Sequence, residues 1–399
     1  MNIFKKIYCR IYQFAFKIMM PFLPYREPKI LNTNDEVCDV LKSFKIKNVL
    51  IVTDNGITAL GLYNGLVQKL KDYGIGVFVY DKTVANPTTL NVQDGELFYK
   101  QNNCEAIIGF GGGSAMDCAK AIGAKIANPK KTLKQMKGVL KVRKKIPLLI
   151  AVPTTAGTGS ETTLAAVITD SQTRYKYAIN DFPLIPKYAL LDANLTVGLP
   201  KHITSTTGMD ALTHAIEAYI GNSTTKKTRQ CSLFAIKTIF ENILQAYISP
   251  QNMNARKNML IASYNAGLAF TKSYVGYVHA IAHSLGGKYN VSHGLANAII
   301  LPHVLNIFGN KIYKKLHQIA VYCGLATKNT PKEHSAKLII NKIEWLNEQM
   351  NIPTTVKELK KEHISELAIT AEKEANPLYP VPVLFSAKEL ENIFYKLLN

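Results

Sequence analysis

The sequence lacks paired cysteines and long hydrophobic runs, and it is poor in acidic residues. Its six cysteines are scattered, and no two of them form a C-x-x-C pair. This excludes a disulfide framework and a zinc ribbon, and it favours a reducing, cytoplasmic setting. No run of about 18 apolar residues occurs, and no small-residue cleavage site follows the N-terminal segment, so neither a spanning helix nor a secretory signal is expected.

Apolar and basic residues are abundant. Of the 399 residues, 47% are hydrophobic and 19% are charged, which excludes general disorder and leaves room for about two domains. Lysine and arginine number 48 against 28 acidic residues, a net charge of +20. The densest basic stretch consists of Lys134, Lys137, Lys141, Arg143, Lys144 and Lys145. It lacks the interleaved aromatics or recognition motif of a nucleic-acid groove, so we interpret it as a solvated loop and expect no nucleic-acid partner.

Residues 1–28 form a basic amphipathic extension. Apolar residues recur at helical spacing over residues 3–19, basic residues fall between them, and Pro21 and Pro24 are predicted to end the helix. Such a helix binds a membrane surface or a partner groove, for which the shell and core proteins of a bacterial microcompartment are one candidate. The alternative is packing on its own protein or on a sister subunit. No candidate site residue lies here, so we expect the segment to be dispensable for chemistry.

From residue 48 onward the pattern alternates between short apolar runs and helical stretches. Strands are expected at 48–53, 76–80, 104–110 and 148–152. This alternation predicts a doubly wound α/β, Rossmann-like domain over 29–198, whose ligands bind at the carboxyl ends of the strands. Long helical patterns then dominate, so residues 199–399 are predicted to form an all-α domain, with the boundary near 192–200.

Two loops and one carboxylate at expected strand ends indicate a nucleotide site. Gly111–Ser114 stands between a strand and a helix, where glycines let a phosphate approach the backbone, although a plain tight turn fits equally well. The segment PTTAGTGSE over 153–161 offers a cradle of hydroxyl and amide donors, or else a helix cap. Asp54 is placed to accept hydrogen bonds from a ribose, which favours NAD over NADP, with a helix N-cap as the alternative.

A cluster of imidazoles and one carboxylate is the strongest signal of chemistry. Asp210 and His214 are four residues apart, as are His279 and His283, and His293 follows ten residues later. A spacing of four puts both members of a pair on one helix face. This donor set suits a divalent transition metal such as Fe(II) or Zn(II).

With these motifs in place, the chain resembles the iron-containing (group III) alcohol dehydrogenases from about residue 29 to 399. The matching segments are VTDNGI, NPTTLNV, GGGSAMDCAKAIG, PTTAGTGSE, VITD, LLDANLT, GMDALTHAIEAY, HAIAHSLGGKYNVSHGLANAIILPH and NPLYPVP. The resemblance implies a dehydroquinate synthase-like architecture, an α/β domain followed by an all-α metal-binding domain. It also implies a homodimer or higher homo-oligomer that transfers hydride between NAD(H), with NADP(H) as the alternative, and a small primary alcohol or aldehyde of the ethanol, butanol, or propanediol and lactaldehyde type.

Individual roles carry over only at matching positions. The implied metal ligands are Asp210, His214, His279 and His293, with Fe(II) favoured and Zn(II) as the alternative. His283 is the implied proton-transfer residue near the nicotinamide and the substrate. The implied cofactor contacts are Asp54, Asn86, Pro87, Gly112, Gly113, Ser114, Asp117, Thr154, Thr155, Thr158, Thr163 and Lys176. The implied substrate-pocket positions are Phe270, Ala165 and Val275; since pocket positions vary in the family, substrate identity is not inherited.

Three other functions remain as alternatives. A glycerol dehydrogenase-like enzyme is disfavoured by the intact DALTHAIEAY segment. A dehydroquinate synthase-like lyase would need several basic residues near the metal ligands, and the stretch from His279 to His303 contains only Lys288. A non-catalytic polyanion or membrane-surface binder rests on the net charge and the N-terminal segment alone.

Overall fold

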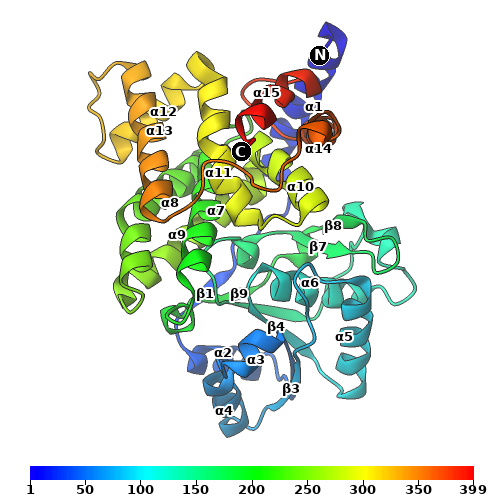
Figure 1. The fold of residues 1–399 in the computed structure, drawn as a ribbon. Coiled ribbons are helices and arrows are strands. Elements are labelled where there is room, and N and C mark those ends of the chain that lie inside the picture. Colours follow the sequence, from blue (N-terminus) through cyan, green and yellow to red (C-terminus); the bar gives the residue numbers. More distant parts are fainter. The chain divides into compact units, whose positions relative to one another are not determined.

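The computed structural model describes residues 1–399, apart from the side chain of Pro21. The chain forms two compact units. One is an α/β unit of residues 24–198, and the other is a helical unit that joins residues 1–23 to 199–399 (Figure 1). No helix among the described residues is both long enough and apolar enough to cross a membrane.

The α/β unit is built on a six-stranded sheet in the order β1-β9-β6-β4-β2-β3. Every pairing in this sheet is parallel. Its strands are β1 (Lys29–Leu31), β2 (Asn48–Val52), β3 (Gly76–Tyr80), β4 (Ala106–Gly111), β6 (Leu148–Pro153) and β9 (Tyr188–Leu190). Because parallel strands need crossover connections, helices cover both faces, and the predicted doubly wound class is confirmed.

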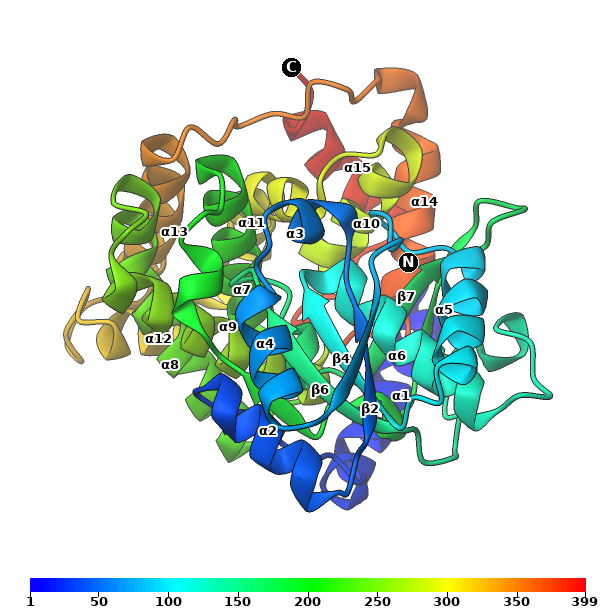
Figure 2. The same ribbon diagram turned by 90° about the horizontal axis from the view of Figure 1, so that it is seen from below.

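Alternating side chains of the central strands feed two separate cores. Leu50 and Val52 of β2 pack with α5 (Thr89–Gln101) and α6 (Gly113–Ala127). Val49 and Ile51 point the other way, toward α2 (Asn34–Ser43) and α4 (Asn64–Asp72). Figure 2 shows the two helix pairs on opposite sides of the sheet. The carboxyl edge between the two layers is therefore left for the loops that carry the candidate cofactor residues.

Two local features differ from the sequence-based expectation. The helical stretch that follows the strand expected at 48–53 is not one helix but two, α3 (Asn55–Ala59) and α4, separated by Gly61 with a φ of 63°. This left-handed conformation ends a helix and is easy only for glycine. A three-stranded sheet of β5 (Gly138–Val139), β8 (Lys176–Asn180) and β7 (Ala165–Thr169) was not expected at all.

The helical unit contains no strand, as predicted for the C-terminal half. Its helices are α1 (Ile3–Met19), α7 (Lys201–Ile220), α8 (Lys226–Ile248), α9 (Met253–Ser273), α10 (Tyr277–Tyr289), α11 (His293–Phe308), α12 (Tyr313–Tyr322), α13 (Lys332–Gln349), α14 (Ile364–Ala375) and α15 (Ala387–Lys396). Helix α7 is buried along most of its length, so its polar residues Asp210, His214 and Glu217 lie inside the unit.

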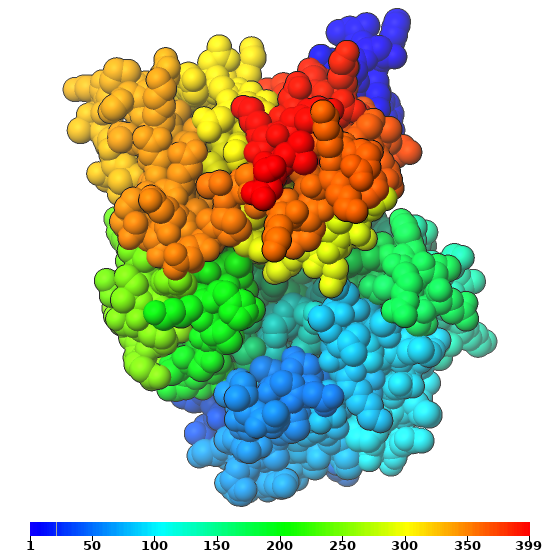
Figure 3. Space-filling model, in the orientation of Figure 1, coloured from blue at the N-terminus to red at the C-terminus, as the bar shows by residue number. Residues whose placement is uncertain are grey.

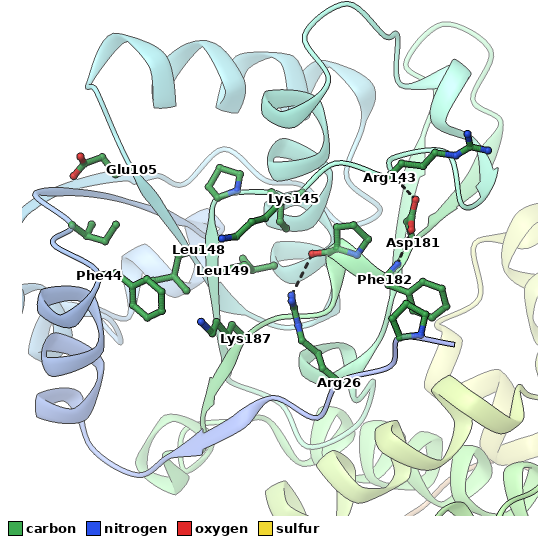
Figure 4. A pocket seen from close by; sticks show the side chains of 15 residues that line it. Arg26, Phe44, Glu105, Arg143, Lys145, Leu148, Leu149, Asp181, Phe182 and Lys187 are labelled. Atoms are coloured by element: carbon green, nitrogen blue, oxygen red, sulfur yellow. Dashed lines mark hydrogen bonds between the residues drawn. The ribbon is translucent and has the colours of Figure 1, made fainter. Parts of the chain in front are cut away.

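A cavity of about 660 Å³ opens in the α/β unit at the amino ends of the strands (Figure 4). Glu105 precedes β4, Leu148 begins β6 and Lys187 precedes β9, and all three line it. Figure 4 shows Arg26 reaching across it to a backbone carbonyl, and Arg26 donates to the carbonyls of Pro183 and Ile185. Ligands of doubly wound sheets bind at the opposite, carboxyl edge, so this cavity is not the candidate cofactor site.

Candidate metal centre and cofactor-binding edge

The helical unit brings four potential metal-ligating side chains together. The ligand atoms of Asp210, His214, His279 and His293 all lie within 4.8 Å of one another. Asp210 Oδ1 is 3.9 Å from His214 Nδ1, 3.8 Å from His279 Nε2 and 3.5 Å from His293 Nε2. These are the four residues named from the sequence, and three of them are buried.

Close packing of α7 against the start of α11 sets this geometry. Asp210 and His214 lie one turn apart on α7, and His293 is the first residue of α11. A Cβ placed on Gly294 would lie 2.5 Å from the carbonyl oxygen of Thr206. Since real Cβ atoms never approach backbone that closely, only glycine lets α11 come near enough for His293 to reach Asp210.

Glu217 orients His279, and no pattern in the sequence had indicated it. Its Oε2 lies 2.6 Å from His279 Nδ1 and accepts from Gly276 N at 2.8 Å, while its Oε1 accepts from Val278 N at 2.8 Å. The carboxylate therefore holds the imidazole with Nε2 facing Asp210. Burial and the neighbouring histidines keep the pKa of His279 well below its usual range, which favours the neutral imidazole that ligates metals.

Asn297, one turn after His293 on α11, is a second residue that was not predicted. Its Nδ2 donates to Asp210 Oδ1 at 2.7 Å and lies 3.1 Å from His293 Nε2. It is completely buried. The amide thus fixes the Asp210 carboxylate relative to His293. Its position four residues after His293, on the same helix face, could have indicated Asn297. An asparagine is not a typical metal ligand, however, so the residue type gave no such indication.

His283 lies beside the metal group rather than in it. Its ring stacks on that of His293 with centroids 5.1 Å apart, and its side chain is 41% exposed. Its Nδ1 lies 2.5 Å from Glu374 Oε1, which also accepts a hydrogen bond from Tyr379 Oη at 2.7 Å. Burial raises the pKa of Glu374, but its interactions with His283 and Tyr379 outweigh this, and the net pKa is lowered.

The three expected pocket residues divide between the units. Phe270 at the end of α9 stacks its ring on that of His214, with centroids 4.0 Å apart and planes 12° apart. Val275 is half-buried just before α10. Both belong to the unit that holds the metal group, whereas Ala165 begins β7 in the α/β unit, where its carbonyl accepts from Lys120.

In the α/β unit, Asp54 and the glycine run lie together at the carboxyl edge. Asp54 follows β2 and caps α3 by accepting from Ile57 N at 3.0 Å. A Cβ on Gly111 would lie 3.7 Å from Asp54 Oδ2, which places the carboxylate beside the glycine run. The N-cap of α6, Gly112, provides no side-chain cap, so the first amides of α6 are available to an anion.

The threonine-rich loop adjoins the same glycines. A Cβ on Gly112 would lie 3.7 Å from Thr155, and one on Gly113 would lie 3.0 Å from Thr158 Cγ2. Thr154 donates its backbone N–H to the carbonyl of Gly111 at 3.1 Å. The two loops therefore form one surface at the ends of β4 and β6, where added side chains would occupy the space that a pyrophosphate needs.

Two of the expected cofactor contacts, Asp117 and Thr163, instead take part in hydrogen bonds that hold the threonine-rich loop in place. Lys120 of α6 is completely buried, and its Nζ donates to backbone or side-chain oxygens of Ser160, Thr163 and Ala165. Burial lowers the pKa of Lys120 to about 8. Asp117 accepts from Ser160 Oγ and from the backbone N–H of Val167. The Thr163 hydroxyl and the Asp117 carboxylate are thus already engaged by the protein.

The remaining expected cofactor contacts are Asn86, Pro87 and Lys176. They lie at the part of the sheet's carboxyl edge that is next to β3. Asn86 has a φ of 57°, and its backbone N–H donates to Ser114 Oγ at 3.3 Å. Lys176 Nζ donates to Asn86 Oδ1 at 2.7 Å. The carbonyl of Pro87 accepts from Thr169 N at 2.8 Å. These bonds connect the loop after β3 to the start of α6 and to the small sheet.

The metal group fits the divalent ion that the sequence implied, and the carboxyl edge of the sheet fits the implied dinucleotide. The buried His279 Nε2 has no hydrogen-bond partner and faces Asp210 Oδ1. One carboxylate with three imidazoles is a donor set for a divalent transition metal. The uncapped start of α6, its crowded glycines and Asp54 match the requirements of a dinucleotide. Together they define a metal-dependent oxidoreductase that uses a nicotinamide dinucleotide.

Comparison with known proteins agrees with this class. The family model of iron-containing alcohol dehydrogenase matches residues 31–193, and that of the Fe-containing alcohol dehydrogenase family C-terminal region matches 204–398. Alcohol dehydrogenase 4 of Saccharomyces cerevisiae is 41% identical to this chain. The matched region spans 91% of this chain and 94% of the yeast protein. The solved 1,3-propanediol oxidoreductase has 33% identity and a TM-score of 0.89, over 94% of this chain and 98% of its own.

A third relative was solved with a cofactor. It is the sulfoacetaldehyde reductase of Bifidobacterium kashiwanohense in complex with NAD+, with 28% identity and a TM-score of 0.82, over 94% of this chain and 98% of its own. The chain belongs to the iron-containing alcohol dehydrogenase family. It is therefore an oxidoreductase that acts on alcohols, and the resemblance inferred from its motifs is confirmed.

Proposed function

We propose that this protein interconverts small primary alcohols and their aldehydes with NAD(H), at the group formed by Asp210, His214, His279 and His293. The observation that carries the proposal is the convergence of these four ligand atoms within 4.8 Å. A divalent ion held there supplies a Lewis acid that lowers the pKa of an alcohol, and the nicotinamide supplies the hydride chemistry.

The residues around the group prepare it for that role. Glu217 holds His279 Nδ1, so that Nε2 is directed at the ion site. Asn297 donates to Asp210 Oδ1, the oxygen that faces the three imidazoles, and so fixes the carboxylate in the group. Such supporting bonds set ligand orientation and basicity, and their loss weakens metal binding about 10-fold to 100-fold.

His283 is the proposed proton carrier. Its Nδ1 is engaged by Glu374, so the ring exchanges a proton through Nε2. Because the side chain is 41% exposed and stacks on His293, it connects the surroundings of the metal group to solvent. A histidine in this position supports general acid–base transfer of the alcohol proton.

The surroundings of the metal group favour an uncharged substrate. Phe270 and Val275 contribute apolar surface in the same unit. Lys288, the single basic residue between His279 and His303, is paired with Glu366 at 2.7 Å. A phosphorylated substrate would need unpaired cations, so this pairing disfavours the dehydroquinate synthase-like alternative. The family relatives named for alcohols and for 1,3-propanediol support small primary alcohols.

The test is an alcohol panel at defined metal loading. The protein is stripped with a chelator, reloaded with Fe(II) or Zn(II), and assayed for NADH formation with ethanol, butanol, 1,2-propanediol, 1,3-propanediol and glycerol 1-phosphate. We expect turnover of the uncharged primary alcohols, its loss on stripping and its recovery on reloading. Absence of NAD-linked turnover with every uncharged alcohol and its aldehyde, or a preference for the phosphorylated compound, would refute the proposal.

A further inference from the structure

The N-terminal helix α1 is docked on the helical unit through its polar side. Arg10 donates to the carbonyls of Val381 at 2.7 Å and Pro382 at 2.9 Å. Gln13 donates to the carbonyl of Tyr379 at 2.7 Å and is 5% exposed, and Cys9 is 1% exposed. Figures 1 and 3 show the helix at the surface beside α14 and α15. The usual arrangement of an amphipathic helix, apolar side inward, is therefore reversed.

The outward half of α1 is entirely apolar or aromatic. At 3.6 residues per turn, half of its circumference carries only isoleucine, phenylalanine, tyrosine, alanine and methionine side chains. Phe4 is 79% exposed, and Ile11 and Phe14 are each 64% exposed. Ile7 and Ile18 lie between them on the same half and are also exposed. A continuous apolar stripe of this kind marks a binding surface.

Basic residues border this apolar half on both sides. Lys5 lies along one boundary and pairs with Glu372. Arg10 and the exposed Lys17 lie toward the other, and Lys6 is half-buried on the docked side. Helix α1 contains no acidic residue. Long basic side chains at such boundaries reach the headgroup level while their stems cover apolar surface. The helix is too short and too charged to cross a bilayer, so its geometry is that of a helix lying in the plane of an interface.

We propose that the outward half of α1 binds the surface of a membrane rich in anionic lipids. The exposed isoleucine and phenylalanine side chains insert at the boundary between headgroups and acyl chains. The exposed Lys17 contacts the anionic headgroups, and the hydrogen bonds of Arg10 and Gln13 keep the helical unit attached. The net charge of +20 adds attraction toward the same surface.

Charge argues against a second copy of this chain as the occupant. Two α1 helices placed face to face offer no acidic residue to the exposed Lys17 of either copy. Basic side chains brought together in this way repel. Anionic headgroups supply the missing opposite charge on a surface that also accepts apolar side chains. The docked polar side leaves no second apolar stripe with which α1 could join its own fold.

The experiment measures flotation of the full-length holoenzyme with vesicles. Vesicles of phosphatidylcholine alone are compared with vesicles that also contain phosphatidylserine, at low and high salt. We expect binding to the anionic vesicles only, and weaker binding at high salt because screening shortens the attraction. Ile11→Asp places a charge at the centre of the apolar half and is expected to weaken binding at least about tenfold.

The matched control is Ile248→Asp on α8, an isoleucine 55% exposed against 64% for Ile11. It is expected to bind like the wild type, and both variants should keep wild-type turnover because neither residue touches the metal group or the cofactor edge. Failure of the wild type to float, or equal flotation of the Ile11→Asp and wild-type proteins, would overturn the proposal. So would an oligomer in ultracentrifugation that Ile11→Asp dissociates while vesicle binding is absent, since a second copy would then cover the stripe.

Discussion

The two units provide chemistry in different ways. In the helical unit, side chains on the long helices α7, α10 and α11 converge on one point, and buried partners such as Glu217 and Asn297 hold them. In the α/β unit, backbone amides and small loop residues at the ends of β2, β4 and β6 form a surface, and Lys120 supports it from below. A metal needs a few fixed donor atoms, whereas a dinucleotide needs room and many amides.

This division predicts that damage to one site leaves the other intact. His279→Ala should abolish metal binding and lower turnover at least about a thousandfold, because a buried ligand is lost from a four-donor set. Binding of NADH, measured by its fluorescence, should stay near the wild-type level. The control is His202→Ala, an exposed histidine two turns before Asp210 on the same helix. Substantial turnover or a full metal content in the His279→Ala variant would remove the metal assignment.

The corresponding change in the α/β unit is Lys120→Met. It leaves up to five buried acceptor oxygens of Ser160, Thr163 and Ala165 without their donor. We expect a loss of about 3 kcal/mol in the free energy of unfolding, measured with denaturant, since an unsatisfied buried group costs about 1–3 kcal/mol. NADH should bind more weakly, while the metal content of the remaining folded protein should be normal.

Exposed Lys71 on α4 provides the control for that change. Lys71→Met should alter the free energy of unfolding by less than about 0.5 kcal/mol. If Lys120→Met is equally harmless, then Lys120 does not support the threonine-rich loop. If it removes the metal but spares NADH binding, the separation between the two sites is wrong.

A smaller effect is expected when a supporting residue of the metal group is changed. Glu217 uses both oxygens to accept from three donors, so Glu217→Gln turns an amide N–H toward one of them. Metal affinity should fall about 10-fold to 100-fold, while excess Fe(II) should restore much of the turnover. The exposed Glu241→Gln variant on α8 should have wild-type affinity. A Glu217→Gln variant that folds and binds metal normally would show that His279 needs no such orientation.

The same contrast explains what the sequence could predict. The metal group could be predicted because a helix puts residues four apart on one face, and two such pairs, Asp210 with His214 and His279 with His283, occur together with His293. The role of Glu217 could not be predicted, because its partner His279 is 62 residues away in the sequence and no local periodicity connects the two. Asp117 was expected among the contacts of a phosphate loop, and only tertiary packing shows that it bonds to Ser160, to which Lys120 also donates.

Periodicity likewise predicts helix α1 but not its orientation. An amphipathic pattern is expected to turn its apolar side inward, and only the hydrogen bonds of Arg10 and Gln13 reveal the reverse. The small sheet was missed because β7 and β8 are only five residues long and stand between loops instead of leading into an α-helix. Short segments of this length are stabilised as strands by their pairing with each other.

The smallest predicted effect tests the residue for which the sequence left two roles open. Asp54 does cap α3, and it also lies beside Gly111, so both roles are compatible. Asp54→Gly removes the charge with only a few tenths of a kcal/mol lost in capping. The ratio of kcat/KM for NADP to that for NAD should rise about tenfold, because the carboxylate would repel a 2′-phosphate. Asp54→Asn keeps an oxygen for Ile57 N and should show part of the same gain, which separates charge from capping. A wild-type protein that already prefers NADP, or two variants with unchanged ratios, would limit Asp54 to its capping role.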